Sequence, residues 1–177
     1  WVRPFNAETG ANFQKNLGFI EGNSWQYTFM VAHDTKGLIR LMGGEQAYSN
    51  QLQKVFDLGQ FDMTNEPNIG YPYLFNYVSD QEWRTQKKVS ELIKTHFRNT
   101  PDGLPGNDDT GTMSAWLIYS MMGLYPVSPA DPIYAVTTPV FDKIIIQLDS
   151  RYYDQSQLVI EKEGKGVIKQ LKIGEEI

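Results

Sequence analysis

The chain has 177 residues, of which 41% are hydrophobic and 21% are charged, so it is a folded globular protein and not a disordered segment. Its net charge is −5 and it has no long run of lysine or arginine, which argues against nucleic acid as a partner. No stretch of 18 apolar residues is present, so we also expect no membrane span.

The first 125 residues carry helical patterns. We expect helices over residues 23–31, 34–42, 45–58 and 72–78, and a longer one that begins at residue 79. Ser79 and Glu82 have the spacing of a capping box, and Trp83, Val89 and Leu92 fall on one apolar face behind it. The segment over residues 112–123 is apolar on all sides, which predicts a helix buried all round.

The pattern changes to β-structure after residue 125. Runs rich in β-branched residues predict strands over residues 133–137, 143–148, 158–162 and 167–173, with a hairpin turn at residues 164–166. The predicted fold class is therefore α+β. We expect one domain of helices over residues 1–125 and a small antiparallel β region over residues 126–177.

The first polar loop places Glu21 and Gly22 directly before a helix that Asn23 or Ser24 can cap. Phe19, Ile20 and Trp25 surround Glu21 in the sequence, and apolar surroundings raise the pKa of a carboxyl group, as a general acid requires. The alternative interpretation is an ordinary solvated carboxylate near a helix terminus, and this loop alone favours that alternative.

The second polar loop, residues 101–111, ends in Asn107, Asp108 and Asp109 at the start of the apolar helix. Adjacent carboxylates repel one another unless one is protonated, ligated or hydrogen-bonded. One of the two is explained by capping the helix, but two together indicate a site about as strongly as they indicate a cap.

The third polar loop contains Asn65, Glu66 and Asn68 ahead of an aromatic run. Carboxylate, amide and carbonyl oxygens suit a hard cation such as calcium, although an ordinary turn explains the same residues more simply. Carboxylates on separate loops, abundant aromatic residues and no serine or cysteine nucleophile motif favour glycoside hydrolysis. A non-catalytic carbohydrate-binding or scaffold protein is the alternative.

Four stretches together resemble the calcium-dependent exo-α-mannosidases of glycoside hydrolase family 92 over roughly residues 1–150. They are EGNSWQYTFMVAHDTKGLIRLMGG (residues 21–44), NEPNIGYPYLFNY (65–77), HFRNTPDGLPGNDDTGTMSAWLIYSMMGLYPVSP (96–129) and DPIYAVTTPVFDKIIIQL (131–148). The resemblance implies a partial (α/α)6 toroid followed by a small β region. It also implies an N-terminal β-sandwich domain in the same polypeptide, mannose-containing glycans as substrate, and export to the bacterial periplasm or cell surface.

The resemblance also assigns roles to residues. Glu21 matches the family's proton donor and Asp109, with Asp108 beside it, matches the base of an inverting mechanism. Trp25, Asn23, Asn107 and Glu66 fall at substrate-binding positions, and Asn65 and Glu66 fall in the segment near calcium.

Two departures from the family pattern bear on specificity. Many members have Asp at the position of Asn107, so its assisting role is in question, and many have a histidine pair where this chain has Asn68, Ile69 and Gly70. Glu21 itself favours ordinary glycosides over mannosyl phosphates, and we expect α-1,2 linkages. Twelve toroid helices need roughly 190 residues, so we expect a fragment that is inactive alone.

Overall fold

The computed structural model describes residues 18–128, 131–172 and 174. The elements, in chain order, are α1 (Ser24–Thr28), η1 (Ala32–Asp34), α2 (Thr35–Leu41), α3 (Glu45–Asp57), η2 (Glu66–Asn68), η3 (Tyr71–Tyr77), α4 (Glu82–His96), α5 (Thr112–Met122), β1 (Leu124–Pro126), β2 (Tyr134–Val136), β3 (Lys143–Gln147) and β4 (Gln157–Glu161). The symbol η marks a 3-10 helix. The expected α-to-β order along the chain is confirmed.

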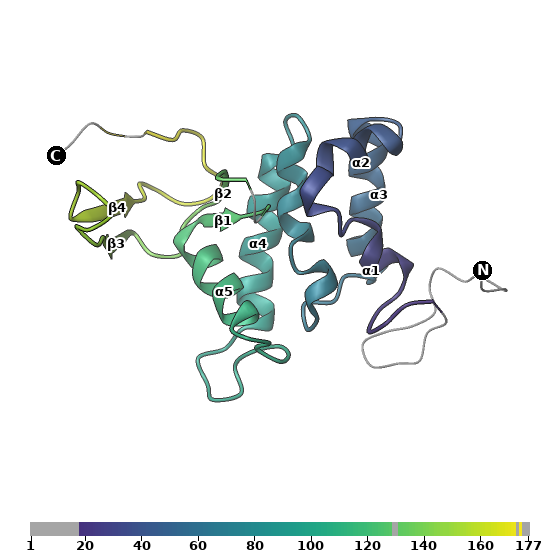
Figure 1. Cartoon of the computed structure of the whole chain (residues 1–177), viewed down its shortest axis with the longest axis horizontal. Helices are drawn as coiled ribbons and strands as arrows, with labels where there is room; N and C mark the ends of the chain where they lie inside the picture. Colours follow the sequence, from purple (N-terminus) through teal and green to yellow (C-terminus); the bar gives the residue numbers. More distant parts are fainter. Residues whose placement is uncertain (1–17, 129–130, 173, 175–177) are drawn as a thin grey trace.

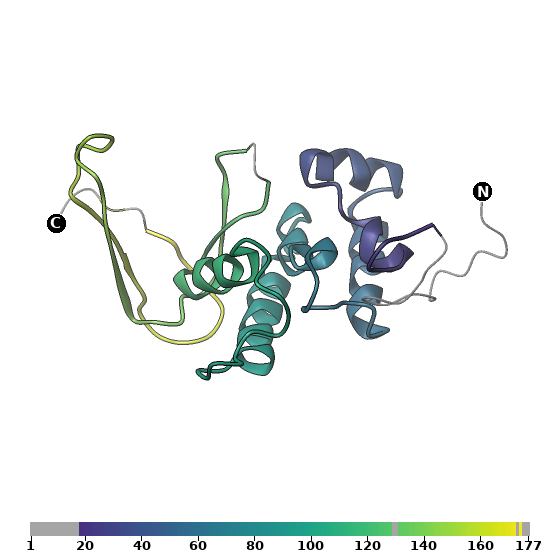
Figure 2. The ribbon, with the colours of Figure 1, turned by 60° about the horizontal axis from the view of Figure 1, so that its bottom comes forward.

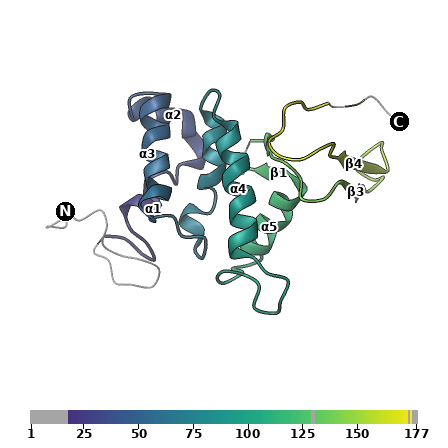
Figure 3. The ribbon, with the colours of Figure 1, turned by 180° about the vertical axis from the view of Figure 1, so that it is seen from behind.

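The helices pack into one body (Figures 1 and 3). Its buried residues form two hydrophobic cores, and η3 contributes side chains to both. The first core packs α1, α2 and α3 around Tyr48, Leu52 and Tyr71. The second packs α4 and α5 around Tyr73 and Trp116. Tyr71 and Tyr73 are two residues apart on η3 and enter different cores, so this short aromatic helix joins the two halves of the body.

Local capping explains where several helices start and stop. Asn23 forms a capping box with Gln26 at the start of α1, and the Asp34 carboxylate accepts a 2.8 Å hydrogen bond from the Gly37 amide at the start of α2. Gly123 ends α5 in the left-handed conformation, with φ of 80°. These are the positions at which the sequence predicted helix ends.

The predicted start of α4 is wrong. The helix begins at Glu82 behind Gln81, which makes no side-chain capping bond, and the Ser79 amide instead donates to the Glu45 carboxylate 34 residues earlier. Val89 and Leu92 are buried as expected, but Trp83 is 50% exposed. A long-range partner has therefore replaced the local capping box.

Helix α5 is confirmed, although it is not buried on every side of the described structure. Met113, Trp116 and Ser120 face the core, whereas Ile118 is 56% exposed. Among the described residues no helix is long and apolar enough to cross a membrane, as expected.

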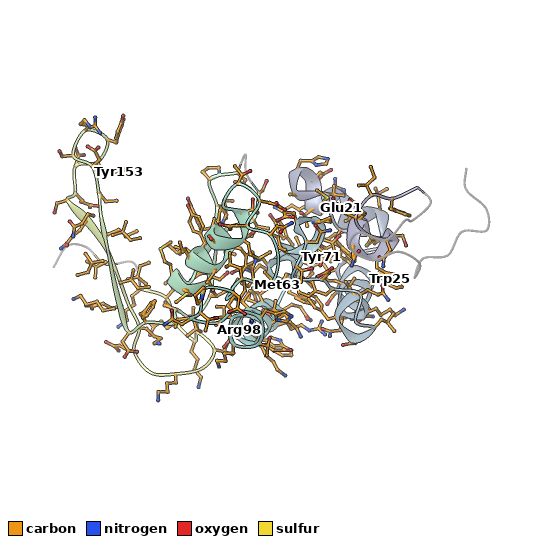
Figure 4. All side chains as sticks on the ribbon, turned by 90° about the horizontal axis from the view of Figure 1, so that it is seen from below. Glu21, Trp25, Met63, Tyr71, Arg98 and Tyr153 are labelled. Carbon is orange, nitrogen blue, oxygen red and sulfur yellow. The ribbon has the colours of Figure 1, made fainter. Side chains whose placement is uncertain are left out.

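The strands form two separate antiparallel pairs, β1 with β2 and β3 with β4. The β3–β4 ribbon extends away from the helices (Figure 2), and Tyr153 lies in its connecting loop at the far end (Figure 4). The hairpin predicted at residues 164–166 is wrong, because residues 167–172 form no strand and residue 173 lies outside the described residues. This segment returns to the helical body, where the Ile168 amide donates to Gln86.

Candidate active site

The Glu21 loop is held by bonds to its backbone. Glu21 has a left-handed backbone, with φ of 54°. The Tyr27 hydroxyl donates to the Ile20 carbonyl, and the Asn65 side-chain amide donates to the Glu21 carbonyl at 2.5 Å. The Glu21 side chain itself is exposed, so the apolar surroundings that the sequence suggested do not enclose it within the described part of the chain.

Asn23 is buried beneath this loop, and both ends of its side-chain amide are bonded within the protein. Its oxygen accepts from the Gln26 amide at 3.1 Å, and its nitrogen donates to the Gln60 side chain at 2.8 Å. The structure therefore gives Asn23 a role in building the loop.

Trp25 lies on α1 and packs against the first hydrophobic core. Figure 4 places Glu21 and Trp25 in the part of the molecule formed by the first helices. The indole nitrogen of Trp25 is buried and has no hydrogen-bond partner among the described residues. Such a donor is available to a ligand oxygen that reaches it.

The loop over residues 101–111 packs directly on the Asn65–Glu66 loop. A β-carbon placed on Gly106 would lie 2.3 Å from the Thr64 carbonyl oxygen, which is inside van der Waals contact. Only glycine allows this approach. The contact joins two segments that are about forty residues apart in the sequence, and it brings Asp109 toward Glu66.

The two adjacent aspartates of this loop have different surroundings. Both carboxylate oxygens of Asp108 accept bonds from Ser114, at 2.7 Å from its amide and 2.8 Å from its hydroxyl. Asp108 therefore secures the first turn of α5. Asp109 and Thr110 have left-handed backbones, with φ of 39° and 62°, and Asn107 and Asp109 are both exposed.

Glu66 interacts with both predicted catalytic carboxylates. Burial raises the pKa of the Glu66 carboxyl above its ordinary value, and contact with Asp109 and the negative charges of Asp109 and Glu21 raise it further. Its Oε1 atom is buried and has no hydrogen-bond partner among the described residues. Three carboxylates from three loops therefore share one electrostatic environment.

Shifted carboxyl groups with unsatisfied oxygens are typical of functional sites. Glu66 is thus a half-buried carboxyl group beside two other carboxylates. A group of this kind can accept a bond from a sugar hydroxyl or coordinate a hard cation.

Calcium fits this site in part. Glu66 offers one anionic oxygen that no described protein group satisfies, which suits a hard cation. Within residues 18–128, 131–172 and 174, however, no three His, Asp or Glu side chains are close enough to hold a metal ion together. The other ligands would therefore have to be amide or carbonyl oxygens, water or the sugar.

The whole chain was also compared with known proteins. Residues 1–176 match the model of the glycosyl hydrolase family 92 catalytic domain. The chain belongs to glycosyl hydrolase family 92. An uncharacterized secreted glycosidase from Arthroderma benhamiae is 32% identical over 127 residues, which are 72% of this chain and 16% of that protein.

Solved structures of family members share the fold. The α-mannosidase BT3965 from Bacteroides thetaiotaomicron, in complex with mannoimidazole, is 29% identical with a TM-score of 0.76, over 85% of this chain and 22% of that one. The inverting mannosidase BT2199 from the same organism is 28% identical with a TM-score of 0.73, over 91% and 24%. The expected fold class, part of an (α/α)6 toroid with a small β region, is thereby confirmed.

This chain of family 92 spans less than a quarter of the length of these relatives.

The sequence indicated the three polar loops but not the residues that join them. Thr64 is one of these, since its amide and hydroxyl both bond to Asp62 and its carbonyl meets Gly106. The Asp-x-Thr spacing at residues 62–64 is a local turn signal that would have pointed to it.

Proposed function

We propose that this chain carries the general acid and the general base of an inverting exo-α-mannosidase. The enzyme removes terminal α-linked mannose from glycans and prefers the α-1,2 linkage. The observation that carries the proposal is the meeting of three polar loops: Asn65 donates to the Glu21 carbonyl, and Gly106 of the Asp109 loop packs against the Thr64 carbonyl. The left-handed backbones of Glu21 and Asp109 add support, because strained residues cluster at active sites. The mannosidase names of the structural relatives support the substrate class.

Glu21 acts as the acid in this mechanism. Its exposed carboxyl donates a proton to the glycosidic oxygen as the bond between that oxygen and the anomeric carbon breaks. The aglycone leaves as a neutral alcohol, and Glu21 is left as a carboxylate.

Asp109 acts as the base. Its carboxylate removes a proton from water while the water oxygen bonds to the anomeric carbon on the face opposite to the leaving group, which inverts the anomeric configuration. Asp108 is bonded to α5 and thereby fixes the backbone from which Asp109 projects. Asn107 is exposed beside them and is available to bond to the water or the sugar.

Glu66 binds mannose or a cation in this proposal, through the Oε1 atom that no described group satisfies. Calcium would be held by Glu66, with Asn65 as the second residue that the sequence assigned to it. When bound, the ion would orient the hydroxyls of mannose and help to distort its ring.

The complete enzyme, in this proposal, joins this chain to an N-terminal β-sandwich domain in one polypeptide. The short span of the chain relative to its relatives supports this extension. The sandwich would cover the exposed Glu21 and complete the mannose site. We further propose export to the bacterial periplasm or cell surface, in keeping with the secreted relative.

The test is hydrolysis of the four α-mannobioses by the complete enzyme, followed by proton NMR. We expect release from the α-1,2 isomer to be fastest, β-mannose to be the first product, and a calcium chelator to reduce the rate. First release of α-mannose would overturn inversion. Mannose binding by calorimetry without any hydrolysis would indicate the carbohydrate-binding alternative. The isolated 177 residues should be inactive, and robust turnover by them would contradict the need for the sandwich.

A further inference from the structure

We infer that Asn65 is a positioning residue for the general acid, in that its side-chain amide holds Glu21 in the strained backbone conformation from which the acid acts. This inference rests on the proposed function, which assigns the acid to Glu21. It uses the amide nitrogen of Asn65, whereas the calcium contact proposed above would use the amide oxygen.

The strain at Glu21 requires a restraint. A residue other than glycine in the left-handed region costs about 1–3 kcal/mol and persists only where its surroundings hold it. Glu21 has φ of 54°, while its side chain is exposed and so gains little packing of its own. The restraint must therefore act on its backbone.

Asn65 supplies that restraint directly. Its Nδ2 atom donates to the Glu21 carbonyl oxygen at 2.5 Å, across 44 residues of sequence. Asn65 is only 6% exposed, so the donor side of this part-buried bond is held in place by the surrounding protein. The Tyr27 hydroxyl restrains the preceding carbonyl, that of Ile20, whereas the Asn65 bond reaches the acid residue itself.

Asn65 is also the residue directly before Glu66, at the extended N-cap of η2. One residue thus ties the backbone of the acid to the loop whose carboxyl interacts with both Glu21 and Asp109. Loss of the amide donor should let Glu21 relax away from the leaving group while the rest of the site stays in place.

The activity of Asn65 variants on substrates with different leaving groups shows whether Asn65 positions the acid or only stabilises the fold. The complete enzyme would be assayed on an α-mannobioside, whose alcohol needs a proton, and on 2,4-dinitrophenyl α-mannoside, whose leaving group does not. We expect Asn65→Ala and Asn65→Asp to lower kcat/KM for the mannobioside by about 100-fold, as small misplacements of catalytic groups do. Turnover of the dinitrophenyl substrate should stay close to that of the unsubstituted enzyme.

Asn65→Asp is the decisive variant, because it keeps the shape of the side chain and any ability to bind calcium but replaces the donor with an oxygen. Ser120→Ala is the matched control, since it removes a buried 2.6 Å hydrogen bond to Tyr73 far from Glu21. It should lower thermal stability without changing the ratio of the two activities.

Equal losses on both substrates would overturn the inference, as would an Asn65→Asp variant with full activity on the mannobioside. Recovery of Asn65→Ala by added calcium would do the same, because it would assign the residue to the cation. If the unsubstituted complete enzyme hydrolyses neither substrate, the proposed function itself has failed and not only the role of Asn65.

Discussion

The Glu21 loop and the Asp109 loop both hold a carboxylate on a left-handed backbone, but different contacts fix the two loops. Each presents a predicted catalytic carboxylate from a left-handed backbone, with φ of 54° at Glu21 and 39° at Asp109. The Glu21 loop is held by the side chains of Tyr27 and Asn65, which donate to the Ile20 and Glu21 carbonyl groups. The Asp109 loop is held by backbone contact at Gly106 and by the bonds between Asp108 and Ser114.

This difference predicts whether each loop can lose its geometry without a loss of stability in the whole protein. Side-chain hydrogen bonds can be removed one at a time, so the acid loop should lose its geometry gradually. The base loop packs its backbone at Gly106 against Thr64 and is bonded to the first turn of α5 through Asp108, so changes there should affect stability and activity together. The following variants test that contrast, from the largest expected effect to the smallest.

Gly106→Ala should have the largest effect, because its methyl group would overlap the Thr64 carbonyl. We expect a loss of about 1–3 kcal/mol of stability, typical of overpacking, and about 100-fold lower kcat/KM as Asp109 moves. Thermal melting and mannobioside kinetics measure the two effects. Gly70→Ala is the control for stability, since nothing lies within 4 Å of its added methyl. Equal melting temperatures for the two variants would contradict the close approach.

Asp108→Ala should cost about 0.5–2 kcal/mol of stability, as the loss of a helix-terminal acceptor does. The Ser114 amide and hydroxyl would both lose their partner at the start of α5. Asn107→Ala, at an exposed neighbour, should change the melting temperature far less. If the two variants melt alike, Asp108 does not secure the helix.

Tyr27→Phe should cost about 0.5–1.5 kcal/mol, since it removes one hydrogen bond, that to the Ile20 carbonyl. The ring remains, and with it the stacking on Phe19. Activity on the mannobioside should fall less than in Asn65→Ala, because the bond lost is one residue away from Glu21. A larger loss than in Asn65→Ala would reverse the assignment of the main restraint.

Glu45→Gln should have the smallest effect, which is a change in how the melting temperature depends on pH. The Ser79 amide donates to the Glu45 carboxylate and lowers the pKa of that group below its ordinary value of 4.5. A lowered pKa means that the stabilisation is present above pH 4.5 and is lost as the pH falls through the folded-state value. The difference in melting temperature between the two proteins should therefore shrink in acid. A difference that grows in acid would contradict this sign.

Local signals were sufficient where the interaction is local. Asn23 and Asp34 start helices and Gly123 ends one, all through bonds to neighbours within a few residues. The sequence predicted a helix boundary at each of these positions. The start of α4 was mispredicted because the partner of Ser79 is Glu45, which no local pattern reveals. The strands β3 and β4 were predicted from their β-branched runs, but their pairing with each other was not, because the predicted hairpin joined residues 158–162 to residues 167–173.

The sequence indicated candidate residues for the site but not their arrangement in space. Two neighbouring aspartates left a helix cap and a functional site equally open, and the structure bonds Asp108 to Ser114 in the first turn of α5. The raised pKa of Glu66 was not predicted, because its burial depends on how distant loops pack. The contacts of Asn65 with Glu21 and of Gly106 with Thr64 are equally long-range, so no local pattern indicates which residues they join.

The most direct test of the account compares Glu21→Gln and Asp109→Asn in the complete enzyme on an α-mannobioside and on 2,4-dinitrophenyl α-mannoside. Loss of an acid or base lowers the rate by about 10²–10⁴-fold. We predict this loss for Glu21→Gln on the mannobioside alone, and for Asp109→Asn on both substrates, because only the base is needed for either leaving group. Unchanged turnover of the mannobioside by either variant would contradict the assignment of the acid and the base.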